Sequence, residues 1–290
     1  MTETPVDLDI RPVAGRIGAE IHGLDLSRPP TNAEAEAIRQ ALYAHRVIFF
    51  PGQTLTPEQQ LTFGGLFGQP RDTPHVASMP DYPEIIEIIK EPEETNVYNF
   101  GGDWHTDMTF LEEPAKGAVF YAMEVPPAGG DTIWANMAAA YDSLSDGMKD
   151  LLADMRAVHS PKKSYGTSGK YTGDVIPNKT MTVIPTEEAD VGETLHPVVR
   201  TLPETGEKSL YINPNYTIRF EDMTEEESKP MLEYLCRHAQ RDELCVRYRW
   251  SAGTVAVWDN RCTMHRALND YDGHRRVARR VTIGGDRVEA

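Results

Sequence analysis

The sequence predicts a mostly β fold with α-helical inserts, arranged as a double-stranded β-helix (a jelly-roll or cupin-like architecture). Two observations favour this fold. Short apolar segments typical of strands recur between long inserts, and a strand expected over 277–284 returns late in the chain. No Pro/Gly/Ser-rich linker, internal repeat or low-complexity tract interrupts the 290 residues. We therefore expect a single domain over 1–290.

The first hundred residues are expected to alternate between helices and strands. Thr31 with Glu34 forms a capping box, and Thr56 precedes Pro57, a residue favoured in the first turn of a helix. The expected elements are, in order, a helix over 31–45, a strand over 47–50, a helix from 56 and a strand over 85–89.

The rest of the chain is expected to be richer in strands. Apolar runs and turn signals predict strands over 117–125, 131–134, 209–213, 244–249, 254–258 and 277–284. A helix is expected over about 137–156. Another should follow the capping box formed by Thr224 and Glu227, where Pro230 predicts a kink or a later start.

The segment at about 160–195 is polar and rich in Ser, Thr, Gly, Lys and Pro. A structureless loop of this length inside a compact domain is usually either functional or a locally disordered insert. We expect it to be a lid over the active site.

Composition excludes several classes of protein. The net charge of −16 and the absence of a basic face argue against a nucleic-acid-binding protein. No apolar run approaches the ~20 residues of a membrane helix. The three cysteines have no metal-binding or redox spacing, and the start of the chain lacks the pattern of a secretory signal. We therefore expect a cytoplasmic protein with reduced cysteines, no nucleic-acid partner and no membrane partner.

Three residues predict a metal site: His105 and Asp107, separated by one residue, and His265 far downstream. Two imidazoles and one carboxylate can hold one face of a ferrous ion and leave the other face open, which is the ligand set of non-haem iron oxygenases. A closed zinc site would use four protein ligands, and calcium would prefer oxygen ligands. His-x-Asp alone is a common tripeptide, so the motif needs support from elsewhere in the chain.

That support follows His265, where Arg276 and Arg280 lie four positions apart. In a strand, side chains four apart point to the same face. Both guanidinium groups would then face the metal cavity, and a planar, permanently charged fork is suited to gripping a carboxylate with two hydrogen bonds. Iron beside a carboxylate clamp indicates a dicarboxylate co-substrate. By the same alternation, Arg275 and Arg279 should be solvated or salt-bridged on the opposite face.

Several motifs resemble the taurine dioxygenase/2,4-D dioxygenase family of Fe(II)- and 2-oxoglutarate-dependent oxygenases. The resemblance covers nearly the whole chain. The matching segments are Trp104-His-Thr-Asp-Met-Thr-Phe110, Pro127-Ala-Gly-Gly-Asp-Thr132, His196-Pro-Val-Val-Arg200, Leu210-Tyr-Ile-Asn213 and Trp258-Asp-Asn-Arg-Cys-Thr-Met-His265. It implies a double-stranded β-helix, and Fe(II), 2-oxoglutarate and O2 as metal and co-substrates. It also implies a homodimer or homotetramer.

The resemblance assigns roles to individual positions. It implies that His105, Asp107 and His265 are the metal ligands and catalytic residues, and that Thr132 and Arg276 bind 2-oxoglutarate. The residues at substrate positions are Arg280, His75, Tyr165, Tyr216 and Met108. The taurine-specific enzymes carry an asparagine where this chain has Gly101, which argues against taurine itself.

The function expected is hydroxylation of a small anionic substrate next to a heteroatom, with C–S or C–O cleavage and formation of succinate and CO2. Sulfonates such as taurine and alkyl sulfates are the first candidates, and aryloxyalkanoates are the alternative. Two other classes remain open: a metal-dependent hydrolase on the same scaffold and a non-catalytic binding protein. A hydrolase would have no need of Arg276, and the complete set of three metal ligands argues against a protein that only binds.

Overall fold

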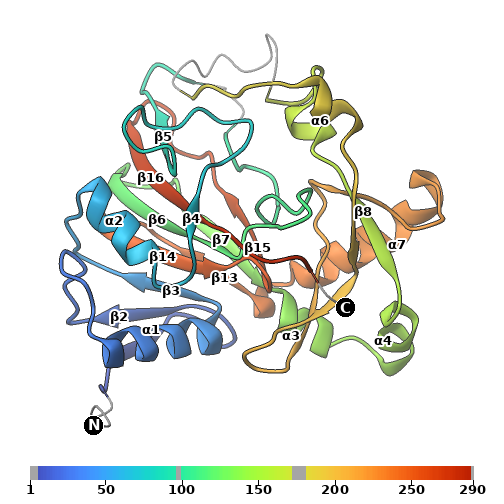
Figure 1. Ribbon diagram of the computed structural model, residues 1–290, viewed down its shortest axis with the longest axis horizontal. Coiled ribbons are helices and arrows are strands. Elements are labelled where there is room, and N and C mark those ends of the chain that lie inside the picture. Colours follow the sequence, from blue (N-terminus) through green and yellow to red (C-terminus); the bar gives the residue numbers. More distant parts are fainter. Residues whose placement is uncertain (1–5, 96–98, 172–180, 289–290) are drawn as a thin grey trace.

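A computed structural model describes residues 6–95, 99–171 and 181–288 of this chain. Its largest sheet has eight strands (Figure 1). The order is β1 (Asp9–Pro12), β2 (Ala19–His22), β3 (Val47–Phe50), β14 (Thr254–Asp259), β6 (Gly117–Glu124), β16 (Arg276–Ile283) and β4 (Pro70–Arg71), with β5 (Ile85–Lys90) also paired to β16. Only β2 and β3 pair in parallel among these described strands.

Three smaller sheets complete the β structure. They are β13 (Cys245–Tyr248), β7 (Thr132–Asn136) and β15 (Thr263–Ala267); β12 (Thr217–Phe220), β8 (Arg156–His159) and β9 (Thr194–Pro197); and the hairpin β10 (Val199–Thr201) with β11 (Lys208–Leu210). The helices are α1 (Asn32–His45), α2 (Pro57–Gly64), α3 (Met137–Asp142), α4 (Asp146–Leu152), α5 (Lys162–Tyr165), α6 (Glu187–Val191) and α7 (Glu225–Ala239), with a 3-10 turn at Asp242–Leu244. The predicted mostly β fold with helical inserts is confirmed.

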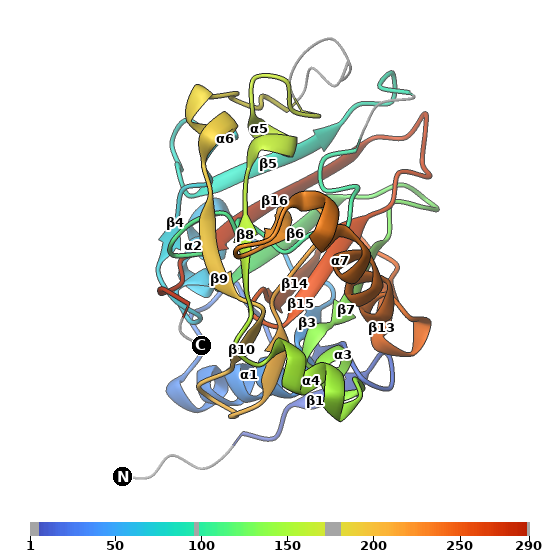
Figure 2. The ribbon, with the colours of Figure 1, turned by 90° about the vertical axis from the view of Figure 1, so that its right-hand side faces the viewer.

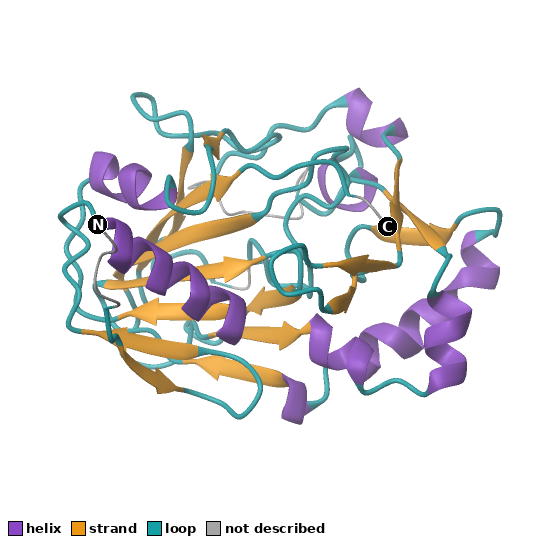
Figure 3. Cartoon of the chain, turned by 60° about the horizontal axis from the view of Figure 1, so that its bottom comes forward, coloured by secondary structure: helices purple, strands orange, loops and turns teal. Residues whose placement is uncertain are grey.

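The large sheet is covered on both faces, which explains its continuous apolar strands. In β3, Ile48 and Phe50 pack into one hydrophobic cluster, together with residues of α1 and α2. Val47 and Phe49 pack into another cluster that contains Trp134 of β7. Successive side chains of a strand point to opposite faces, so the four-residue run of β3 serves both layers. Figure 3 shows α1 lying across one face of the sheet.

The helices α3, α4 and α7 form a second region, beside the strands β8 and β9 (Figure 2). Its hydrophobic cluster includes Leu152, Leu210, Phe220 and Leu235. Contacts between α3 and β11 and between α7 and β12 hold this region together. No helix within the described residues combines the length and apolar composition that a membrane span needs.

Most elements predicted from the sequence are present, and two of the predicted helices differ. The helix expected over 137–156 is two helices, because the Ser145 side chain caps the N–H of Met148 and starts α4, and residue 156 opens β8. A start of α7 after Pro230 is wrong, because the capping box at Thr224 starts the helix at Glu225. Pro230 falls in the second turn, where the lost hydrogen bond lies on an exposed face.

The segment expected to be a structureless lid is partly regular. Its described parts include α5, α6 and the first strand residues of β9, while residues 172–180 lie outside the described residues. Val183 forms an isolated bridge with Val76, and the N–H of Ile184 donates to the carbonyl of His75 at 2.8 Å. The segment is therefore anchored to the loop that carries His75.

A capping substitution tests the energetics of α1. Thr31 accepts a hydrogen bond from the N–H of Glu34 at 3.2 Å, and the Glu34 carboxylate accepts from the N–H of Thr31 at 2.8 Å. We expect Thr31→Ala to lower the free energy of unfolding by about 1 kcal/mol. Chemical denaturation followed by circular dichroism measures this. Thr54→Ala, at an exposed residue outside the helices, is the matched control and should change stability by less than about 0.5 kcal/mol.

Candidate metal centre and active site

The three predicted metal ligands lie together, although they come from separate elements. His105 and Asp107 belong to the loop between β5 and β6, and His265 lies on β15. An isolated antiparallel bridge joins the first ligand to the last: the N–H of His105 donates to the carbonyl of His265 at 2.9 Å, and the reverse bond measures 2.7 Å. The hydroxyl of Thr106 also donates to the carbonyl of Thr263 at 2.8 Å. The backbone thus holds the loop against the strand.

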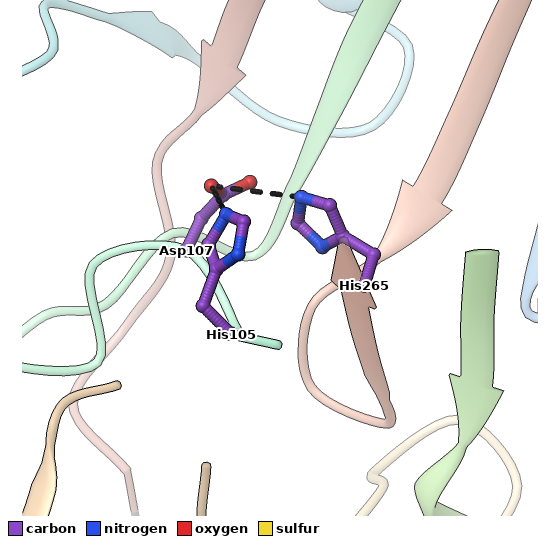
Figure 4. Close-up of side chains that lie close together, drawn as sticks. All are labelled: His105, Asp107 and His265. Atoms are coloured by element: carbon purple, nitrogen blue, oxygen red, sulfur yellow. Dashed lines mark ion pairs between the residues drawn. The ribbon is translucent and has the colours of Figure 1, made fainter. Parts of the chain in front are cut away.

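The side chains converge, as Figure 4 shows. Asp107 Oδ1 lies 3.6 Å from His105 Nε2 and 4.0 Å from His265 Nε2. One ligand atom from each of the three residues can be chosen so that all lie within 4.8 Å of one another, and all three residues are buried. Within the described residues this is the one group of three such side chains found. Two nitrogen donors and one carboxylate facing a common point fit a divalent iron held on one face.

Neighbouring groups orient these ligands. His105 Nδ1 lies 2.7 Å from the carbonyl oxygen of Asp103, so Nδ1 carries the proton and donates it, and Nε2 is left with a lone pair for the metal. Asn260 Nδ2 donates to Asp107 Oδ2 at 3.3 Å, and Asn260 Oδ1 accepts from Trp258 Nε1 at 2.9 Å. The indole therefore fixes the direction of the amide, and the amide holds one oxygen of the carboxylate.

Electrostatics keep the ligands in their metal-binding forms. Burial alone raises the pKa of Asp107, but the positive charge of Arg280, whose Nη1 donates to Oδ1 at 2.9 Å, and the nearby histidines outweigh it and lower the pKa overall. Burial, then the neighbouring His105, lowers the pKa of His265 to about 3. At neutral pH, Asp107 is a carboxylate and His265 is neutral, as metal ligation requires.

A cavity opens beside these ligands. His105, His265, Thr132, Arg276 and Arg280 all line it. Arg276 and Arg280 thus face the same space, as the spacing along β16 predicts. Five of the thirteen residues that line the cavity are Phe or Trp, and these large rings help to exclude water.

Arg276 is the most unusual residue of this cavity. Its side chain is only 5% exposed, its Nε has no hydrogen-bond partner, and no ion pair involves it within the described residues. Its guanidinium carbon lies 5.4 Å from the centre of the Phe120 ring. Burial lowers the pKa of Arg276, and the nearby Tyr271 and Asp131 offset this effect only in part. A buried arginine without a carboxylate in direct contact indicates a site for an anionic ligand.

Thr132 lies at the start of β7 and is also buried. Its hydroxyl oxygen accepts a hydrogen bond from Trp250 Nε1 at 3.0 Å. A hydroxyl that accepts one bond still has a proton to donate. Thr132 and Arg276 can therefore both offer donors to one ligand in the cavity.

The other predicted substrate residues form a cluster next to the metal ligands. The His75 ring stacks on Tyr165 with centroids 5.1 Å apart, and the Tyr216 hydroxyl donates to that of Tyr165 at 3.4 Å. Tyr216 approaches His105 edge-on, with centroids 6.5 Å apart. Met108, with a φ of 51°, belongs to the same buried cluster. Of the five predicted substrate residues, Arg280 alone lines the cavity described above.

Arg280 faces the metal cavity, as predicted, whereas Arg279 differs from its predicted surroundings. The Nη1 of Arg280 donates to Asp107, and its Nε has no partner within the described residues; its contact with a substrate anion stays a prediction. Arg279 was expected to be solvated or salt-bridged, which is wrong: it is buried and donates to the carbonyl of Leu55 at 2.6 Å. The loop before α2 covers that face of β16. Arg275 does form the expected ion pairs, with Glu91 and Glu124.

Sequence reasoning missed two residues of this site, Asn260 and Trp250. Asn260 lies in the segment Trp258-Asp-Asn260 that carried the resemblance, so its position was marked but not its role. Trp250 follows β13 and belongs to no motif that would have singled it out. Only the pairing of β13 with β7 brings it to Thr132.

Comparison with known proteins agrees with this geometry. The chain matches the family described as "Taurine catabolism dioxygenase TauD, TfdA family" over residues 9–282. It is 38% identical to the alpha-ketoglutarate-dependent sulfate ester dioxygenase of Pseudomonas putida, across 97% of this chain and 91% of the relative. It is 35% identical to an alkylsulfatase of Acinetobacter baylyi, across 96% of this chain and 86% of the relative.

Solved structures agree as well. A taurine dioxygenase from Burkholderia xenovorans superposes with a TM-score of 0.79 at 35% identity, covering 96% of this chain and 90% of the other. The jelly-roll prediction and the expected oxygenase class are thereby confirmed. The chain belongs to the TauD, TfdA family, and it is an alpha-ketoglutarate-dependent dioxygenase.

Proposed function

We propose that this enzyme is an Fe(II)-dependent dioxygenase that uses 2-oxoglutarate to hydroxylate a small alkyl sulfate at the carbon next to the ester oxygen. One atom of O2 enters succinate and the other enters the substrate carbon. The hydroxylated ester then separates into an aldehyde and inorganic sulfate, and CO2 leaves the keto acid. The observation that carries this proposal is that His105 and His265, which converge with Asp107, share a cavity with Arg276, a buried arginine that forms no ion pair within the described residues.

The donor set fits iron. The three ligands occupy one side, and the cavity lies open beside them. Fe(II) bound there would supply the redox chemistry with O2 that amino-acid side chains cannot perform. The chain contributes the placement of the reactants and the exclusion of water.

The dicarboxylate 2-oxoglutarate would account for the buried charge of Arg276. Its far carboxylate would neutralise Arg276 and accept hydrogen bonds from the guanidinium and from the hydroxyl of Thr132. The aromatic walls lower the local dielectric and strengthen this pairing. A hydrolase would have no use for such an anchor.

The alkyl sulfate assignment rests on the two relatives named for sulfate esters and on the residues next to the metal ligands. Arg280 donates a hydrogen bond to Asp107, and within the described part of the chain its Nε has no partner. Burial lowers the pKa of His75, so that ring is neutral at pH 7 and can offer a hydrogen bond but no full charge. Arg280 is therefore the main partner for the sulfate.

The buried cluster around Tyr165, Tyr216 and Met108 suits the apolar part of such a substrate. The described part of segment 160–195 supplies Tyr165 and bridges to Val76, so we propose that this segment is the lid of that subsite. The aromatic character would also suit an aryloxyalkanoate, which the substrate panel below includes as a competing class.

Removal of the metal carboxylate tests the ligand set. We expect Asp107→Asn to weaken Mn(II) binding, used as an oxygen-stable substitute for iron, by more than about 100-fold, because loss of an outer-shell partner alone costs about 10–100-fold. Asp103→Asn is the matched control: it removes a partly exposed carboxylate but keeps the backbone carbonyl that orients His105. Titration followed by electron paramagnetic resonance measures both. Equal affinity of the Asp107 variant and the wild type would refute the assignment.

The co-substrate clamp is tested by two identical substitutions on one strand. Arg276→Lys keeps the charge but loses the fork, so we expect the KM for 2-oxoglutarate to rise about tenfold, or ~1.4 kcal/mol. Arg279→Lys alters the buried arginine on the other face of β16 and should leave that KM within about twofold. Succinate formation at varied 2-oxoglutarate measures both. A similar rise in the two variants would assign the effect to strand packing.

The substrate class is tested with a panel. We expect succinate formation to be coupled to sulfate release with linear alkyl sulfates, and to be at least about tenfold weaker with taurine or phenoxyacetates. Each methylene that enters the apolar cluster contributes about 0.8 kcal/mol, so KM should fall up to ~4-fold per carbon until the cluster is filled. Faster turnover of phenoxyacetates than of alkyl sulfates would contradict this assignment and would identify the enzyme as an aryloxyalkanoate dioxygenase.

A further inference from the structure

Trp250 is a buried residue to which neither the sequence motifs nor the metal site assigns a role. It lies just beyond β13, is 6% exposed and lines the cavity together with Thr132. Its Nε1–H donates to Thr132 Oγ1 at 3.0 Å. Strand pairing places the two side chains together, because Tyr248 of β13 is the register partner of Thr132.

The hydrogen bond determines what the threonine can offer. A hydroxyl has one proton and two acceptor lone pairs, and its proton rotates to suit its partners. The indole N–H is a donor only, so Thr132 must accept from it. No other hydrogen bond of Oγ1 is recorded within the described residues, which leaves the threonine proton for a ligand in the cavity.

We propose that Trp250 is a positioning residue for the co-substrate. Its N–H occupies one lone pair of the Thr132 hydroxyl and thereby directs the hydroxyl proton to the far carboxylate of 2-oxoglutarate. This inference rests on the proposed function, in which Thr132 and Arg276 bind that carboxylate.

The ring of Trp250 supports the second anchor as well. It packs against Phe120 with centroids 4.8 Å apart, and the guanidinium carbon of Arg276 lies 5.4 Å from the centre of the same Phe120 ring. Trp250 therefore contacts Thr132 directly and is linked to Arg276 through one shared aromatic neighbour.

A comparison with Trp134 indicates that the hydrogen bond from Trp250 to Thr132 does more than satisfy a buried donor. Trp134 is fully buried in the same aromatic cluster, and its Nε1 has no acceptor among the residues that the structure describes. The fold thus tolerates one unpaired indole N–H in this cluster. Trp250 differs from Trp134 in that its donor meets a residue facing the co-substrate.

A double-mutant cycle tests the proposal. The variants are Trp250→Phe, which keeps the ring but removes the donor, Thr132→Val and their combination. Affinity for 2-oxoglutarate is measured calorimetrically on the full chain loaded with Mn(II), and KM and kcat are measured with Fe(II). We expect Trp250→Phe to weaken 2-oxoglutarate binding about 5- to 10-fold and to raise its KM, with kcat changed less than about twofold.

The combination decides whether Trp250 acts through Thr132. The double variant should bind 2-oxoglutarate no more than about twofold more weakly than Thr132→Val alone. Tyr248→Phe is the matched control, since it removes a donor from a ring that packs edge-on against Trp250, while its hydroxyl serves Glu20. That control should retain wild-type affinity. Unchanged affinity of Trp250→Phe, or fully multiplicative losses in the double variant, would overturn the proposal.

A second measurement covers the case in which Trp250→Phe does not fold. The indole N–H resonance of Trp250 is identified as the one whose chemical shift changes in Thr132→Val. In the wild type, this resonance should shift when 2-oxoglutarate is added. An unchanged chemical shift would overturn the proposal. Failure of the proposed function looks different. In that case the Mn(II)-loaded wild type would not bind 2-oxoglutarate at all, whatever the state of Trp250.

Discussion

The whole site depends on the two backbone hydrogen bonds between His105 and His265. His105 and Asp107 come from a loop, and His265 comes from a strand more than half the chain away in sequence. The backbone bridge between His105 and His265 sets the distance between the loop and the strand. Because the side chains branch from bonded backbones, their ring centroids are held 4.2 Å apart. Asn260 and Arg280 then fix the carboxylate of Asp107 between them. Preorganisation of this kind spares the metal the cost of ordering its ligands.

The layers of the fold explain the position of the cavity beside the three candidate metal ligands. Strand β16 is buried along its length, with α2 on one side and the aromatic cluster on the other. Arginines 276 and 280 point to the aromatic side, and Arg279 points to the side of α2, where a backbone carbonyl receives it. A single strand thus carries cations into two different environments by alternation alone.

Local signals in the sequence were enough for the helices that begin at capping boxes, for five of the eight strands of the largest sheet (β3, β5, β6, β14 and β16) and for the candidate ligands. The capping boxes at Thr31 and Thr224 depend on neighbours three residues away, and the spacing of Arg276 and Arg280 depends on one strand. Strand β15, the role of Asn260 and the contact of Trp250 depend on partners more than a hundred residues distant in sequence, which no local pattern encodes. The prediction that Arg279 is solvated or salt-bridged failed for the same reason, because its partner Leu55 is also distant in sequence.

The contact between Arg280 and Asp107 has a thermodynamic consequence. The guanidinium donates to the same carboxylate oxygen that faces both histidines, so the proposed metal site and the proposed sulfate site share one side chain. Free-energy coupling between two ligands is reciprocal. In the proposed function, an anion bound to Arg280 would leave more of the negative charge of Asp107 for the metal, and a bound metal would release Arg280 toward the anion. Occupancy of either proposed site would therefore raise the affinity of the other.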